Sequence, residues 1–98
     1  MINVSDYIKI VLKKKKMSNI ELTKKINEIE TKLGNKRTSP QNITNYLNGF
    51  NTITKKWLVK VECALDLPLG TLLNMVIEPS SRESKKEIDE LITKVRGK

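Results

Sequence analysis

The stretch that decides the fold is SPQNITNYLNG, residues 39–49, which carries both a start and a stop signal for a short helix. Ser39 is a favoured N-cap residue, and Pro40 suits the first helical position, where its missing N–H is no loss. Gly49 can adopt the left-handed conformation that ends a helix. We therefore predict a helix from about Pro40 to Asn48.

The two sides of this predicted helix differ in chemistry. Ile43, Tyr46 and Leu47 recur at helical spacing and should pack against the rest of the protein. Carboxamides hydrogen-bond the edge of adenine in the major groove, so an amide-rich outer face can select a base sequence while other residues supply affinity. An ordinary solvated helix is the alternative. The outer face comprises Gln41, Asn42, Thr44, Asn45 and Asn48.

Composition limits the class of protein. The chain has 98 residues, of which 38% are hydrophobic, and this suits one small domain with an appendage. With no histidine and one cysteine, the common zinc sites, histidine-based triads and disulfide frameworks are excluded or nearly so. We expect Cys63 to be a core residue. We expect no enzymatic activity, no metal and no cofactor.

Charge and hydropathy bear on partners and location. The formal net charge of +8 favours a polyanionic partner. The run Lys13–Lys16 fits either a solvated helix end or direct contact with phosphate. The chain has no apolar run of about 18 residues and no basic segment followed by an apolar one at its N-terminus. We therefore expect a cytoplasmic protein that does not enter a membrane.

Start and stop signals predict two helices before residue 39. Ser5 can cap a first helix that ends near Lys16. Ser18 and Glu21 form a capping box for a second helix, which Gly34 should end. The second helix therefore covers Asn19 to Leu33, and a polar turn follows it.

Three further helices are predicted after Gly49. Thr54 can cap one whose buried side carries Trp57, Leu58, Val61, Ala64 and Leu65. Pro68 can open a short fifth helix that runs to Val76. We place the domain boundary after this helix, with residues 1–78 as the domain and 79–98 as a polar linker and tail helix.

The tail helix has a capping box at Ser84 and Glu87. A lone amphipathic helix of this length is marginal in water, so its apolar stripe needs a cover. We expect the cover to be a second copy of the chain, which would make a homodimer, with docking on the same domain as the alternative. A different protein partner is a further possibility. The stripe consists of Ile88, Leu91, Ile92 and Val95.

Residues 4–76 resemble the lambda-repressor-like (Xre/Cro) helix-turn-helix family. The segment MSNIELT, residues 17–23, is similar to the start of that family's second helix, with Thr23 where the family has Ala. The family's cap, apolar positions and final glycine in the recognition helix correspond to Ser39, Ile43, Tyr46 and Gly49. The resemblance implies an all-α fold, a five-helix lambda-repressor-like DNA-binding domain. This sequence adds an extended second helix and an additional C-terminal amphipathic helix.

Two departures from the family pattern stand out. Leu12 and Leu47 occupy positions where many members have a buried Arg–Glu pair, and an apolar pair can replace such ions without loss. About ten extra residues lie between Ile26 and Ser39, where the family has a tight turn. This insertion leaves open the path of residues 27–38 and the angle between the second and third helices.

The resemblance implies that bases are contacted by Pro40, Gln41, Thr44 and Asn45. It implies phosphate contacts from Asn19, Ser39, Asn48 and Lys55, to which we add Lys56, beside Lys55. We also add Lys36 and Arg37, because the turn that leads into a recognition helix lies near the duplex backbone. For Lys36, Arg37, Lys55 and Lys56 plain solvated charge is the alternative.

These features together favour a sequence-specific regulator of transcription that binds double-stranded DNA. We expect it to bind an inverted repeat as a homodimer through residues 40–48, as a phage- or mobile-element-type repressor. Two alternatives remain: an antitoxin or conjugative-plasmid accessory DNA-binding protein, and a helical protein–protein interaction module that uses the tail stripe.

Overall fold

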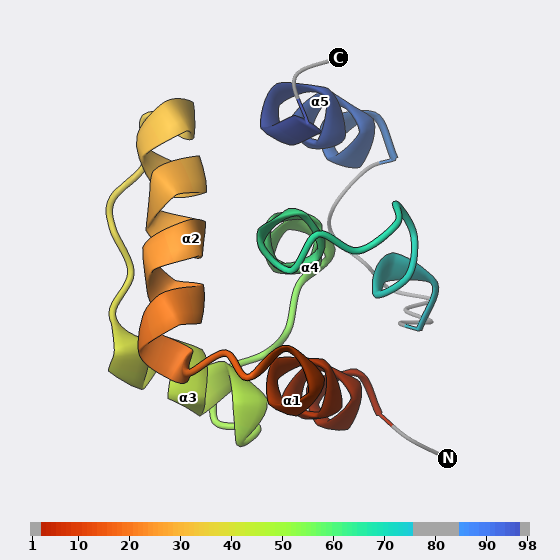
Figure 1. The fold of residues 1–98 in the computed structure, drawn as a ribbon. Helices are drawn as coiled ribbons and strands as arrows, with labels where there is room; N and C mark the ends of the chain where they lie inside the picture. The colour runs from red at the N-terminus through yellow and green to blue at the C-terminus, as the bar shows by residue number, and fades with distance from the viewer. Residues whose placement is uncertain (1–2, 76–84, 97–98) are drawn as a thin grey trace.

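The computed structural model describes residues 3–75 and 85–96. Within these ranges the chain is all-helical, with five α-helices, one 3-10 turn and no strand, as the all-α prediction requires. Figure 1 shows α4 end-on near the middle of the fold, between α2, α5 and α1. None of these helices has the length and apolar character needed to cross a membrane. The elements are α1 (Val4–Lys15), α2 (Asn19–Leu33), α3 (Pro40–Leu47), α4 (Lys55–Ala64), η1 (Leu73–Met75) and α5 (Lys85–Arg96).

Local capping defines most helix starts, as the sequence predicted. The Ser18 hydroxyl accepts the Glu21 N–H at 3.1 Å, and the Glu21 carboxylate accepts the Ser18 N–H at 3.3 Å, which completes the capping box of α2. The hydroxyls of Ser39 and Thr54 cap α3 and α4 in the same way. Gly34 ends α2 with a φ of +77°, so the predicted bounds of α2 are confirmed.

The cap of α1 differs from the prediction. The N-cap residue is Asn3, whose side-chain oxygen accepts the Asp6 N–H at 2.8 Å. Ser5 lies inside the helix instead, and its hydroxyl is 3.5 Å from the carbonyl oxygen of Tyr46. Asn3 is the N-cap because its side-chain oxygen bonds the free N–H of Asp6, three residues further on, which is the spacing that a cap requires.

The predicted helix from Pro68 to Val76 is wrong over its described part, which is a turn followed by the single 3-10 turn η1. The cause is Glu62 of α4, whose side chain is fully buried. Its carboxylate accepts three backbone N–H groups, so the segment wraps around this anion instead of forming its own helical ladder. The donors are Gly70 at 3.2 Å, Leu72 at 2.6 Å and Leu73 at 3.0 Å.

Most of the core lies where α1 to α4 meet, and it includes fully buried Ile8, Leu22, Ile43 and Leu58. Leu12 and Leu47, the apolar pair noted above, are both buried in it. The segment that precedes η1 closes this core with buried Leu72.

The stripe of α5 is covered within the chain, which is a correction to the expected dimer contact. Ile88 and Val95 are buried in one cluster with Val59 of α4, and half-buried Leu91 and Ile92 pack against the same cluster. The cover exists because α4 is apolar on two sides: Leu58 and Val61 face the main core, whereas Val59 faces α5. The predicted cap at Ser84 lies outside the described residues.

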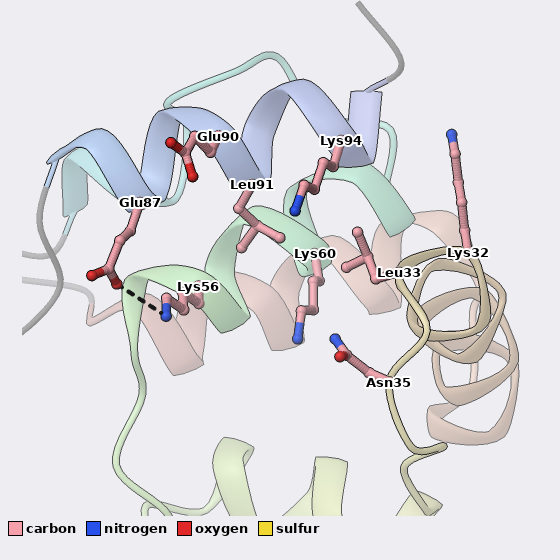
Figure 2. Close-up of a pocket in the computed structure, with 9 residues that line it drawn as sticks. All are labelled: Lys32, Leu33, Asn35, Lys56, Lys60, Glu87, Glu90, Leu91 and Lys94. Atoms are coloured by element: carbon pink, nitrogen blue, oxygen red, sulfur yellow. Dashed lines mark ion pairs between the residues drawn. The ribbon is translucent and has the colours of Figure 1, made fainter.

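Polar contacts at both ends of α5 accompany this packing. The Arg96 guanidinium donates to the Leu67 carbonyl at 3.1 Å and lies 3.7 Å from the Glu62 carboxylate. At the other end, Lys56 and Glu87 form an ion pair at 3.2 Å. Figure 2 shows this pair at the edge of a cavity of about 640 Å³ between α4, α5 and the end of α2, with Leu33 and Leu91 among the side chains that line it.

Candidate nucleic-acid interface

The buried side of α3 determines which of its residues face outward. Ile43 and Leu47 are buried, and the Tyr46 ring stacks on Trp57 of α4 with centroids 4.3 Å apart. As predicted, these three apolar positions pack. Of the predicted base contacts, Pro40 and Gln41 are exposed while Thr44 and Asn45 are half-buried, and the predicted phosphate contacts Ser39 and Asn48 are exposed.

Two outward amides on α3 are hydrogen-bonded to each other. Gln41 Nε2 donates to Asn45 Oδ1 at 3.0 Å, one helical turn apart. This bond leaves Gln41 with its carbonyl oxygen and one N–H, and Asn45 with both N–H groups. The surface of α3 therefore presents an acceptor and several donors without carrying any charge.

Thr44 joins α3 to the start of α2. Its hydroxyl donates to the Pro40 carbonyl at 3.0 Å and accepts the side-chain amide of Asn19 at 2.9 Å. The bond to Pro40 uses the only side-chain donor of Thr44. Thr44 can therefore contact a base only as a hydrogen-bond acceptor. Asn19, a predicted phosphate contact, keeps its carbonyl oxygen and a second N–H.

The inserted residues return along α2, and the side chain of Asn27 holds them there. We call residues 35–39 the return segment; Figure 1 shows this stretch beside α2, leading to α3 at the foot of that helix. Asn27, which is 8% exposed, donates from Nδ2 to the Thr38 carbonyl at 3.0 Å and accepts the Thr38 N–H at 2.7 Å. This amide-to-backbone pair settles the path of the insertion.

Asn42, which the helical spacing placed on the outer face, is an internal bridge. Its Nδ2 donates to the Thr38 hydroxyl at 2.9 Å, and its Oδ1 accepts Nδ2 of Asn51 at 2.9 Å. It therefore connects the return segment before α3 to the turn after it. Together with the Asn27–Thr38 and Asn19–Thr44 bonds, these contacts of Asn42 tie α3 to the segment before it, to α2 and to the turn after it.

The predicted basic contacts stand in different environments. Lys36 and Arg37 are exposed on the return segment and form no ion pair or hydrogen bond within the described parts of the chain. Lys55 is half-buried, and exposed Lys56 has Glu87 as an ion-pair partner. The structure gathers Lys36, Arg37 and Lys56 around one cavity beside α3.

The predictions missed two buried polar residues: Asn27, which positions the segment before α3, and Glu62, which organises the segment after α4. Asn27 follows Ile26 on α2, at the border of the apolar stripe, and Glu62 follows Val61 on the buried side of α4. A polar residue at or beside an apolar stripe is the signal that could have identified both, because such groups must find partners when buried.

No protein-family model, curated protein or solved structure matches the chain.

Proposed function

We propose that the chain binds double-stranded DNA in a sequence-specific manner and regulates transcription, as a protein of the lambda-repressor-like helix-turn-helix class. One observation carries the proposal. The outward amides of Gln41 and Asn45 form a single hydrogen-bonding surface on α3, and α3 itself is held by side-chain bonds from Asn19 and Asn27. A fixed, uncharged surface of donors and an acceptor suits the readout of base edges.

The charge distribution supports a division of labour between affinity and selectivity. The helix α3 has no charged residue, whereas the chain as a whole carries a formal charge of +8. Lys36 and Arg37 stand on the segment that leads into α3, and the exposed run Lys13–Lys16 lies just before the start of α2. Cations at the flanks can hold phosphates while α3 enters the major groove.

We propose a homodimer on an inverted repeat, because one recognition helix on one half-site binds weakly. Its contact surface is not the α5 stripe, which α4 and α2 already cover. Leu69, which is 55% exposed in the segment after α4, is an alternative dimer contact. The alternative function, a helical protein–protein interaction module that uses the α5 stripe, is disfavoured because that stripe is already covered. The antitoxin or plasmid-accessory alternative shares the DNA contacts and differs only in a protein partner.

The proposal is tested by selecting bound duplexes from a random pool. We expect a recurring motif, and tighter binding to a duplex that carries it than to a shuffled duplex of equal composition. Raising the salt concentration should weaken binding to both, with the selected duplex keeping its advantage. If no motif recurs in the selected pool, or if both duplexes bind equally well, the proposal of sequence-specific DNA binding is contradicted.

A further inference from the structure

A second candidate site lies behind α3. An open cavity of about 380 Å³ is lined by residues of α2, the return segment, α3 and α4 and by Thr54. This volume falls within the roughly 300–1,000 Å³ that is typical of small-molecule sites. Neither Gln41 nor Asn45 lines the cavity, so it is separate from the surface proposed to read bases.

The return segment crosses this cavity and is anchored on both sides. At one end Asn35 donates its side-chain amide to the Glu30 carboxylate at 3.1 Å, and at the other Thr38 is held by Asn27. Lys36 and Arg37 lie between these anchors and line the cavity. Two cations are therefore held at the cavity by a fixed stretch of backbone.

Two aromatic residues also line the cavity. Tyr46 and Trp57 both line the cavity, and their rings are stacked with an interplanar angle of 17°. The Tyr46 hydroxyl and the Trp57 indole N–H make no hydrogen bond within the described residues, so both keep their donors. An aromatic pair with unused donors beside the cavity favours a ligand that combines a ring with hydrogen-bond acceptors.

The charges around the cavity do not cancel. The Glu30 carboxylate is paired with Lys60 at 3.0 Å, and both side chains are about 15% exposed or less. Lys56, at the margin, has Glu87 as its partner. Among the residues that the structure describes, no acidic group pairs with Lys36 or Arg37, and this positive charge favours an anion.

We propose that this cavity binds a small planar anion. Its ring would lie beside the stacked pair of Tyr46 and Trp57, and its carboxylate or phosphate would be held by Lys36 and Arg37. A consequence that rests on the proposed function is competition with DNA, because the same two cations are assigned to DNA phosphates. By linkage, each of the two ligands would then weaken binding of the other.

The site is tested by fluorescence. Trp57 is the only tryptophan of the chain and lines the cavity, so the emission comes from a single residue at the site. The full chain, without DNA, is titrated with benzoate and with adenosine monophosphate, and in parallel with their neutral counterparts benzamide and adenosine. We expect a saturable change with at least one anion and at least tenfold weaker binding of its neutral counterpart.

A pair of double variants locates the binding. Lys36→Ala with Arg37→Ala should weaken anion binding at least tenfold at an unchanged melting temperature. Lys24→Ala with Lys25→Ala removes the same charge from exposed positions of α2 that do not line the cavity, and should leave binding unchanged. The proposal is overturned if neither anion saturates, if the neutral counterpart binds equally, or if both double variants behave alike. Because no DNA is present, its failure would leave the proposed DNA binding intact, and the reverse also holds.

Discussion

The side chain of Asn27 and the backbone of Thr38 exchange two hydrogen bonds, at 3.0 Å and 2.7 Å, across eleven residues of sequence. An amide side chain has one donor and one acceptor side, so it pairs with a peptide group much as a neighbouring strand would. This contact closes the insertion onto α2 and sets the point from which α3 starts.

Asn27→Ala should lower the free energy of unfolding by about 1–3 kcal/mol, because the N–H and C=O of Thr38 lose their partners in a partly buried place. Urea denaturation measures this change. The control is Asn35→Ala, whose bond to Glu30 is exposed and whose loss should cost about 0.5 kcal/mol or less. Equal effects of the two substitutions would show that the Asn27 contact has no special weight.

Glu62→Ala should strongly destabilise the fold. It removes the acceptor for three backbone N–H groups and the anion beside Arg96, and we expect a loss of about 3–5 kcal/mol. Glu62→Gln keeps the shape and one acceptor oxygen, so it should cost less. Glu28→Ala, at an exposed position of α2, serves as the control in the same denaturation series. A Glu62→Ala protein as stable as the control would contradict the role assigned to this carboxylate.

Gln41→Ala should weaken binding to the selected duplex by about 1–3 kcal/mol and leave binding to a shuffled duplex nearly unchanged. Fluorescence anisotropy with both duplexes measures the difference. Asn74→Ala removes an exposed amide far along the chain, on η1, and should change neither affinity. An equal loss on both duplexes would mean that Gln41 contacts the backbone of the DNA and not a base.

Replacing Lys36 and Arg37 by alanine should leave thermal stability nearly unchanged, because both side chains are exposed and unpaired within the described residues. It should weaken binding to all duplexes, and flatten the plot of log affinity against log salt concentration by about two units if each cation holds one phosphate. The Lys24→Ala, Lys25→Ala protein is the matched control. An unchanged slope would mean that Lys36 and Arg37 are solvated cations that do not contact phosphates.

Ile88→Ala should destabilise the fold by about 2–5 kcal/mol, because it opens a cavity between α5 and Val59. The molar mass from sedimentation equilibrium should stay that of the unmodified chain, since the stripe is covered intramolecularly. Glu90→Ala, on the exposed side of α5, is the control. A lower molar mass at unchanged stability would instead restore the stripe as a dimer contact.

The sequence by itself determined the helices whose ends depend on neighbouring residues. The bounds of α2 follow from Ser18, Glu21 and Gly34, all of which act within one turn of the helix end. The same holds for the starts of α3 and α4 at Ser39 and Thr54. Helical spacing also determined which residues of α3 are buried. These features are readable because a cap or a stripe involves groups only three or four residues apart.

Only the tertiary structure decided the features that join residues distant in sequence. The path of the insertion depends on Asn27 and Thr38, and the attachment of α3 to the start of α2 depends on the bond from Asn19 to Thr44, across 25 residues. The sequence predicted a helix in the segment after α4, but its N–H groups bond to the buried carboxylate of Glu62 instead. The apolar pattern of α5 showed that its stripe must pack against something. It did not show whether a second copy or the same chain would do so, which depended on Val59, on the far side of α4. A buried polar group needs a hydrogen-bond partner, and an apolar face needs a surface to pack against. The local sequence shows this need but not the partner, which is decided when the whole chain packs.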